Sequence, residues 1–355
     1  MKLEDRISSF DLLGKFLLQF IKNGQIDHSI KALNDKYYNS FNELIIKLQT
    51  FNPWFTEENV RESIHSIAKL LKKETLNKWL SDYSICVKSA KKIGVVLAGN
   101  IPLVGFHDFL SVLVTGNIFI GKLSSKDNKI LPFLKTVLSE MNKEFDELIF
   151  FPEDKLENID AVIATGSDNS ARYFNYYFGK YPNIIRKNRN GIAILNGKES
   201  DNDLENLGKD IFQYFGLGCR NVSKLLVPER YDFNTFFISI EKYNYLYNHY
   251  KYANNVDYNR SIYLMNKTPH LDNGFLLLKE DASITSPLGV LYYSFYSSDK
   301  DLEKYIAENS DKIQCIVSNI SSIDNIIAYG KSQYPELWDY ADGIDTIEFL
   351  VKLYS

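Results

Sequence analysis

Cys219 is the residue in this sequence whose surroundings best suit covalent chemistry. It follows Gly216-Leu217-Gly218, and glycine lets the backbone approach a ligand closely because it has no side chain. Arg220 adds a positive charge beside the thiol, which favours the thiolate, the nucleophilic form of cysteine. The alternative is that Cys219 is a small buried apolar side chain. The sequence therefore makes Cys219 a candidate nucleophile.

Two polar segments each follow a predicted strand. Asn100 comes after the apolar run at residues 93–98, and its amide could donate a hydrogen bond to a developing oxyanion. The alternative is an ordinary turn asparagine. Lys122 ends the next strand and precedes Ser124 and Ser125, where α/β folds bind ligands such as phosphate or ribose. A solvated charge beside a helix cap is the alternative there.

A third segment, Gly166-Ser167, lies between the predicted strand at residues 159–164 and a predicted helix. Backbone N–H groups at such a helix start can bind a phosphate. The alternative is that Ser167 only caps the helix.

Several other site types are excluded. Residues 216–221 begin like the dinucleotide-binding GxGxxG loop, but the third glycine is missing and the segment follows a predicted helix instead of a strand. The sequence holds no GxxxxGK[ST] loop, no HExxH pair and no Cys/His cluster with metal-ligand spacing, so we expect no metal site. The 5 histidines are scattered, and the 3 cysteines, Cys86, Cys219 and Cys315, lie too far apart to suggest a disulfide framework.

The elements that must hold these residues follow an α/β pattern. Residues 7–21 have helical spacing, and Thr56 is predicted to cap a helix that ends near residues 72–73. From residue 93 onward strands and helices alternate, which indicates a mostly parallel sheet with helices on both faces. A second α/β part follows the helix at residues 203–215. The predicted strands lie at residues 93–98, 118–120, 148–151, 159–164, 225–227, 275–278, 290–293 and 313–317.

Composition narrows the class of protein further. The chain has 355 residues, of which 45% are hydrophobic, and a formal net charge of −4, so it is globular and has no general attraction for nucleic acid. The N-terminus lacks the unbroken apolar core of a signal peptide. The most apolar stretch, residues 97–123, is interrupted by polar residues and proline, so we expect no membrane span. Free cysteines fit a reducing compartment, and we expect a cytoplasmic protein.

In order along the chain, these motifs resemble the aldehyde dehydrogenase superfamily, and within it the LuxC-type acyl-CoA reductases. Residues 99–102 resemble the family's Asn-x-Pro oxyanion turn, residues 122–125 its Lys-Pro-Ser-Glu strand end, and residues 165–167 its Thr-Gly-Ser phosphate turn. Cys219 falls at the nucleophile, and residues 52–56 are similar to an N-terminal segment of the LuxC type. The resemblance covers most of the chain.

The resemblance implies an aldehyde-dehydrogenase-like α/β fold in four parts. These are a helical N-terminal region at residues 1–90, a parallel-sheet cofactor-binding lobe at 91–215, an α/β catalytic lobe at 216–320, and a C-terminal segment at 321–355 that returns to the cofactor lobe. It assigns Cys219 and Asn100 to catalysis, and Lys122, Ser124, Ser125, Gly166 and Ser167 to cofactor binding. A homo-oligomer is compatible with this family.

The resemblance also implies an activity, namely reduction of a fatty acyl-CoA to an aldehyde through an acyl-cysteine. Two departures qualify it. The family's Glu-Leu-Gly-Gly run is replaced by residues 185–189, which hold no carboxylate, and the Glu of its Glu-x-Phe-Gly-Pro run is replaced by Ser283. Because Ser125 stands where NAD-preferring members have Glu, with Lys126 next to it, we expect NADPH as the cofactor. The alternatives are an aldehyde-oxidising dehydrogenase and a non-catalytic acyl-CoA or nucleotide-binding module.

Overall fold

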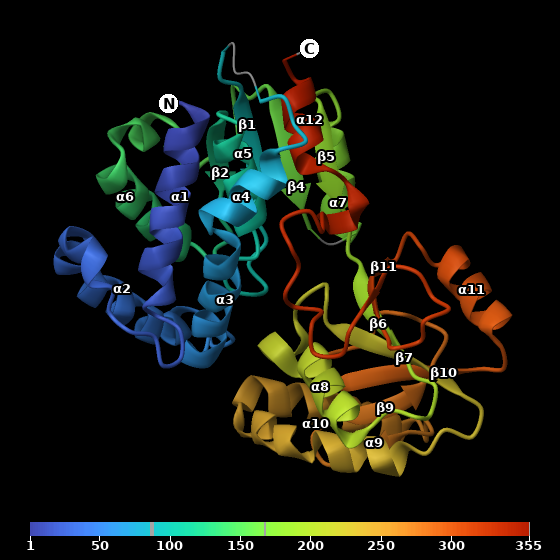
Figure 1. Ribbon diagram of the computed structural model, residues 1–355. Helices are drawn as coiled ribbons and strands as arrows, with labels where there is room; N and C mark the ends of the chain where they lie inside the picture. Colours follow the sequence, from blue (N-terminus) through green and yellow to red (C-terminus); the bar gives the residue numbers. More distant parts are fainter. Residues whose placement is uncertain (86–88, 167, 355) are drawn as a thin grey trace. The chain divides into compact units, whose positions relative to one another are not determined.

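The structure is a computed structural model that describes residues 1–85, 89–166 and 168–354 (Figure 1). The chain forms two compact units. The first unit comprises Met1–Lys187 and Glu336–Ser355, and the second unit comprises Asn188–Pro335. Cys86 and Ser167 lie outside the described residues. The chain thus passes from the first unit into the second and returns.

The first unit begins with a layer of helices, as the helical spacing predicts. They are α1 (Leu3–Leu18), α2 (Lys31–Phe51), α3 (Glu57–Leu70) and α4 (Lys73–Leu80), with the short 3₁₀ turn η1 (His28–Ile30) before α2. Thr56 caps α3, since its side chain accepts a hydrogen bond from the backbone N–H of Asn59 at 3.3 Å. Glu57 and Glu58 occupy the first turn, where negative charge suits the helix dipole. The predicted N-cap is confirmed.

The sheet of the first unit has five parallel strands in the order β3-β2-β1-β4-β5. The four strand runs predicted between residues 93 and 164 correspond to β1 to β4, whereas β5 is not predicted by the sequence. The strands are β1 (Lys92–Val96), β2 (Ile118–Lys122), β3 (Ile149–Phe150), β4 (Ala161–Thr165) and β5 (Asn183–Arg186). The helices among them are α5 (Phe106–Val114), α6 (Ile130–Met141), η2 (Lys143–Glu147) and α7 (Asp168–Phe178).

Alternate residues of this sheet face two different hydrophobic layers, as the two-residue period of a strand requires. Ile93 and Val95 belong to a large core shared with α1 and α5. Val162 and Ala164 of β4 pack instead with Phe174 and Phe178 of α7. The sheet is therefore covered on both faces, which fits its apolar, parallel strands.

The last part of the chain completes the first unit. After the 3₁₀ turn η5 (Ala341–Gly343), helix α12 (Thr346–Lys352) buries Ile347 and Leu350 fully in the large core. The guanidinium of Arg186 on β5 pairs with Asp108 of α5 at 2.6 Å and donates to Thr346 Oγ1 at 3.0 Å. Residues from three distant stretches of chain thus meet at one buried ion pair.

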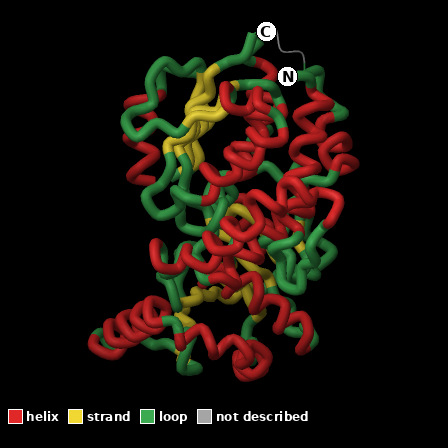
Figure 2. The backbone as a smooth tube through the Cα atoms, turned by 90° about the vertical axis from the view of Figure 1, so that its left-hand side faces the viewer, coloured by secondary structure: helices red, strands yellow, loops and turns green. Residues whose placement is uncertain are grey.

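The second unit has a seven-stranded sheet in the order β12-β11-β6-β7-β10-β9-β8. Figure 2 colours the strands of the chain yellow and the helices red. Its pairs are parallel except that of β8 with β9. The strands are β6 (Asn190–Ile194), β7 (Val222–Pro228), β8 (Leu271–Asp272), β9 (Leu277–Glu280), β10 (Val290–Tyr296), β11 (Ile313–Val317) and β12 (Ile326–Ile327). Its helices are α8 (Asp201–Phe212), η3 (Gln213–Gly216), α9 (Phe233–Ile240), η4 (Glu241–Asn248), α10 (Tyr250–Met265) and α11 (Asp299–Glu308).

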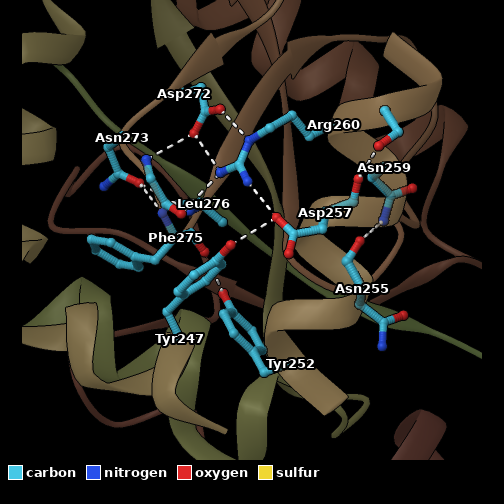
Figure 3. Close-up of polar contacts among 12 residues, drawn as sticks. Tyr247, Tyr252, Asn255, Asp257, Asn259, Arg260, Asp272, Asn273, Phe275 and Leu276 are labelled. Atoms are coloured by element: carbon cyan, nitrogen blue, oxygen red, sulfur yellow. Dashed lines mark hydrogen bonds and ion pairs between the residues drawn. The ribbon is translucent and has the colours of Figure 1, made fainter. Parts of the chain in front are cut away.

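An ion-pair network fastens α10 to strand β8 (Figure 3). Arg260 Nε donates to Asp272 Oδ2 at 2.6 Å, and Arg260 Nη1 donates to Asp257 Oδ1 at 2.5 Å. The hydroxyl of Tyr247 donates to the same Asp257 oxygen at 2.7 Å. Because these groups are partly exposed, each pair contributes at most about 1 kcal/mol. The network therefore holds α10 against β8, which is an edge strand of the sheet. None of its residues belongs to the segment that carries Cys219.

Candidate active site

Three of the predicted site segments follow neighbouring strands of the first unit. Strands β2, β1 and β4 are adjacent and parallel, and Val96 of β1 pairs with both Lys122 of β2 and Ala164 of β4. Their carboxyl ends therefore lie at one edge of the sheet. Asn100, the segment from Lys122 to Ser125, and Gly166 all follow these ends. The structure brings the oxyanion and cofactor candidates of the first unit to the same edge, where open α/β sheets bind ligands.

The turn that carries Asn100 is packed directly against the candidate cofactor segment. A Cβ atom on Gly99 would lie 2.5 Å from Ser124 Oγ, so only glycine allows this approach. Leu103, with a φ of 58°, donates its backbone N–H to Asp127 Oδ2 at 2.9 Å. Asp127 closes a short hairpin with Ser124, since its N–H donates to the Ser124 carbonyl at 3.0 Å. One carboxylate thus joins the two segments.

Burial raises the pKa of Asp127 to about 6, and the hydrogen bond from Leu103 N–H acts in the opposite direction. The cause is desolvation, because removing a carboxylate from water disfavours its charged form. The carboxyl group of Asp127 therefore titrates between its usual range and neutral pH. The hydrogen bond between Leu103 and Asp127, which joins the turn of Asn100 to the segment of Ser124, is therefore sensitive to pH between about 4 and 7.

The cofactor candidates differ in their exposure. Ser125 and Lys126 are exposed, whereas Lys122 and Ser124 are half-buried. The ammonium of Lys122 donates to the backbone carbonyl of Glu153. Because Ser125 and Lys126 present a hydroxyl and a cation, this chain's own donors fit an anionic phosphate group.

The hairpin is also anchored from the N-terminal helices. The buried side chain of Asn52 donates from Nδ2 to the carbonyl of Lys126 at 3.2 Å, and its Oδ1 accepts from the backbone N–H of Trp54 at 3.1 Å. The segment at residues 52–56 therefore has a direct structural role at the candidate cofactor segment. The sequence motif marks this segment, but its contact with residue 126 cannot be derived from local spacing.

Gly166 follows β4 and precedes α7. Its N–H donates to the carbonyl of Arg186 at 3.4 Å, and a Cβ atom at this position would lie 2.8 Å from both Phe174 Cε2 and Ser170 Cβ. The turn is therefore pressed against the first turns of α7, and a side chain at 166 would displace them. The other half of the predicted phosphate turn, Ser167, lies outside the described residues.

Cys219 lies in the second unit, in a tight turn that leads into β7. The turn runs from Gly218 to Asn221, and the backbone N–H of Asn221 donates to the carbonyl of Gly218 at 3.1 Å. Cys219 is half-buried there. Immediately before it, Tyr214 and Phe215 are buried with φ values of 53° and 59°, and Gly216 has a φ of +79°. Non-glycine residues in this region cost about 1–3 kcal/mol each, and such strain concentrates at functional sites.

A second cysteine lies against the same turn. Cys315 of β11 is buried, and its thiol donates to the carbonyl of Arg220 at 3.7 Å. Gly191 lies beside Cys315 in the sheet, and a Cβ atom on Gly191 would lie 2.7 Å from the Arg220 oxygen. Burial raises the pKa of Cys315 to about 12. Cys315 therefore remains a thiol at neutral pH and is chemically inert beside Cys219.

The described residues contain neither a metal-binding cluster nor a membrane-spanning helix. Among those residues, no group of three or more His, Cys, Asp or Glu side chains is arranged to hold a metal ion. Within the same ranges, none of the helices has the length and apolar character needed to cross a bilayer.

Solved structures with a similar architecture include aldehyde dehydrogenases. Aldehyde dehydrogenase 21 from Physcomitrella patens, in complex with the product succinate, is 14% identical with a TM-score of 0.66, and the match covers 99% of this chain and 84% of that one. HpcC from Thermus thermophilus is 15% identical with a TM-score of 0.57, covering 89% and 72%. An NAD⁺ complex of aldehyde dehydrogenase from Bacillus cereus is 11% identical with a TM-score of 0.55, covering 95% and 83%.

The chain thus has the fold of the aldehyde dehydrogenases, a class of oxidoreductases. The acyl-CoA reductase (LuxC) family matches residues 19–230, more than half of the chain, and the chain belongs to that family. No curated protein matches it. The resemblance read from the sequence motifs is confirmed at the level of family and fold. The roles of individual site residues remain predictions.

Proposed function

We propose that this protein reduces a fatty acyl-CoA thioester to the aldehyde through an acyl-cysteine at Cys219, with NADPH as the hydride donor. The observation that carries the proposal is the half-buried thiol in the turn at the start of β7, shortly after the strained Tyr214–Phe215 segment, in a chain of the LuxC family. The first unit would then hold the cofactor and the second unit the nucleophile. A reducing, cytoplasmic compartment suits a nucleophile that must stay a free thiol.

The first step is acyl transfer to the enzyme. The Cys219 thiolate attacks the thioester carbonyl, a sulfur–carbon bond forms, and the tetrahedral oxyanion collapses with cleavage of the bond to CoA. CoA leaves as a thiolate and needs little help from an acid, because thiols have low pKa values. The Asn100 amide and the Cys219 backbone N–H would stabilise the oxyanion, each by about 3 kcal/mol.

The second step reduces the acyl-cysteine. NADPH, when bound, supplies the hydride that reduces the acyl carbonyl. Addition of hydride leaves a tetrahedral oxyanion on Cys219, which re-forms the carbonyl as its carbon–sulfur bond breaks, releasing the aldehyde and restoring the thiolate. Lys122, Ser124, Ser125 and Gly166 would hold the cofactor. The hydroxyl of Ser125 and the cation of Lys126 can accept a 2′-phosphate, which a carboxylate would repel.

Hydrolysis of the intermediate would need a positioned base to activate water. The segment at residues 185–189 offers none, because it contains no acidic residue. Its Arg186 is buried and paired with Asp108. The acyl-cysteine should therefore persist until it is reduced, so the expected product is an aldehyde and not an acid.

Incubation of the protein with a long-chain acyl-CoA alone tests this proposal. We expect one equivalent of free CoA per active site, followed by a plateau, and NADPH should then release aldehyde. Steady release of CoA with accumulation of free acid would contradict the reductase and favour a hydrolytic or aldehyde-oxidising enzyme. No release of CoA, together with tight binding of acyl-CoA, would favour a non-catalytic binding module.

A further inference from the structure

We propose that Asn221 is a positioning residue that fixes the Cys219 thiol for attack. The inference deepens the proposed function and rests on it for the identity of the nucleophile. Asn221 is almost fully buried, with 2% of its surface exposed, and its side chain contacts both the turn and the end of α8. In this role it acts through the backbone that carries Cys219.

The first contact closes the turn reciprocally. The backbone N–H of Gly218 donates to Asn221 Oδ1 at 2.7 Å, while the backbone N–H of Asn221 donates to the Gly218 carbonyl at 3.1 Å. Cys219 and Arg220 are the two residues enclosed between these bonds. Cys219 therefore occupies the second position of a four-residue turn whose ends are bonded twice. Such a turn restricts the direction of the thiol more than a backbone bond alone.

The second contact joins the turn to the end of α8. Asn221 Nδ2 lies within hydrogen-bond distance of three backbone carbonyls, those of Asp210 at 3.0 Å, Ile211 at 3.3 Å and Gln213 at 3.0 Å. Carbonyls in the last turn of a helix have no partner within the helix. One amide thus satisfies the end of α8 and holds the chain on either side of the left-handed Tyr214–Gly216 segment.

A buried carboxylate extends this support to a distant loop of the same unit. Asp210, with 1% of its surface exposed, accepts the backbone N–H of Gly330 at 2.6 Å and that of Ser332 at 2.9 Å. Its own backbone carbonyl is one of the three that Asn221 contacts. The end of α8 is therefore tied both to the nucleophile turn and to residues 330–332.

This arrangement suits acyl transfer, in which the Cys219 thiolate must approach the thioester carbonyl from a defined direction. Conformations in the left-handed region persist for non-glycine residues only where the surroundings over-determine them. Asn221 supplies that restraint on both flanks of the strained segment. Removal of its amide would let the segment relax and move the thiol off the line of attack, while the thiol itself would stay chemically intact.

The test compares Asn221→Ala with the wild type in the burst of CoA from acyl-CoA alone. We expect the burst rate constant to fall by about 10- to 100-fold, since small misplacements of a reacting group have effects of this size. Alkylation of Cys219 by iodoacetamide needs no alignment, so its rate should stay within about threefold. The dissociation constant of NADPH should not change. A burst at the wild-type rate would overturn the proposal.

Asn183→Ala is the matched control. Asn183 in the first unit also donates from Nδ2 to carbonyls near a helix end, those of Tyr181 at 2.8 Å and Phe178 at 3.5 Å. Its loss should lower stability without slowing the burst. If both variants slow the burst equally, the effect is general destabilisation and the proposal is wrong.

Hydrogen exchange keeps this inference distinct from the proposed function. In Asn221→Ala, amides of residues 214–221 should exchange at least about tenfold faster, while those of β10 should keep the wild-type rate. If the wild type gives no burst, the nucleophile assignment fails and exchange still decides whether Asn221 fixes the turn. If the alanine variant does not fold, Asn221→Ser, which can still accept from Gly218 N–H, takes its place. Failure of both to fold would make Asn221 purely structural and overturn the proposal.

Discussion

At the scale of single residues, two cysteines at one turn differ in their exposure. Cys219 is half-buried and follows a strained segment, whereas Cys315 is buried and its pKa is raised to about 12. An acyl acceptor must be reached by its substrate, and of these two cysteines Cys219 has the greater exposure. The two residues are of the same type, and they differ in exposure because of their positions in the fold.

Cys219→Ala should abolish the acyl-enzyme while the protein still folds, and Cys315→Ala should keep acyl transfer. Cys315 only donates a weak hydrogen bond to the Arg220 carbonyl, so its loss removes packing and not a reacting group. Free CoA after mixing with acyl-CoA measures both variants. Turnover at the wild-type level in Cys219→Ala would refute the nucleophile assignment.

Ser125→Glu should reverse the cofactor preference from NADPH to NADH. The exposed Ser125 and Lys126 offer a hydroxyl and a cation, whereas a carboxylate at 125 would repel a 2′-phosphate and could bind a ribose 2′-hydroxyl. We expect kcat/KM for NADPH to fall by at least about tenfold and that for NADH to rise. Ser125→Ala serves as the control, because it removes the hydroxyl without adding charge. Equal kcat/KM for the two cofactors in the wild type would contradict the idea.

At the scale of elements, a single carboxylate connects two loops that follow neighbouring strands. Asp127 lies in the hairpin after β2 and accepts a hydrogen bond from Leu103 in the turn after β1. The bond ties the turn of Asn100 to the segment of Ser124. The hydrogen bond from Leu103 offsets only part of the cost of desolvating the charge, since the pKa of Asp127 remains raised to about 6.

This raised pKa predicts a pH-dependent stability. The folded protein binds the Asp127 proton more tightly than the unfolded chain, whose pKa is 3.8, so this residue's contribution is fully present below about pH 4 and is lost as the pH rises through 6. The difference between these two pKa values corresponds to about 3 kcal/mol in the free energy of unfolding. Asp127→Asn keeps an acceptor for Leu103 N–H without the charge. Urea unfolding should therefore show equal stability of variant and wild type at pH 4, and a more stable variant at pH 7. A constant difference at both pH values would contradict the assignment.

Some strands of this protein can be predicted from the local sequence, and others cannot. Strands β1 to β4 are predictable because each is a short apolar run bounded by turn residues, and the candidate residues after them follow from strand position. Strand β5 is not predictable locally, since Arg186 becomes buried only by pairing with Asp108, 78 residues away. The same holds for β6, where Gly191 lies against the Arg220 carbonyl. The local sequence shows the periodicity of a strand, but it does not show which distant residues that strand will contact.

The candidate site shows the same limit. Cys219 and Asn100 stand out because their residue types have intrinsic chemistry. Asp127, Asn221 and Asn52 do not stand out, because they act through hydrogen bonds to backbone groups of other segments. A buried asparagine beside a candidate nucleophile is the one local signal that could have identified Asn221.

At the scale of the whole molecule, the three tryptophans, Trp54, Trp79 and Trp338, all belong to the first unit. Tryptophan fluorescence therefore reports unfolding of the first unit, while circular dichroism reports helices of both units. The two probes can follow the units separately within the intact chain.

Leu350→Ala should destabilise the first unit. Leu350 of α12 is fully buried in the large core, and truncating such a leucine costs about 2–5 kcal/mol. We expect the fluorescence transition to move to lower urea concentration. Val351→Ala, on a half-buried neighbour in the same helix, is the control and should cost less. Equal shifts in the two variants would show that α12 is not anchored through Leu350.

The route of the chain between the units sets the order in which a ribosome can complete them. Asn188–Pro335 is one continuous stretch, so all strands of the second unit are synthesised before residues 336–355. The first unit must wait for α12, and until then the apolar groups that Ile347 and Leu350 cover stay open to water. The first unit therefore keeps an exposed apolar surface until its last helix is released from the ribosome, and during this interval a holding chaperone has a surface to bind.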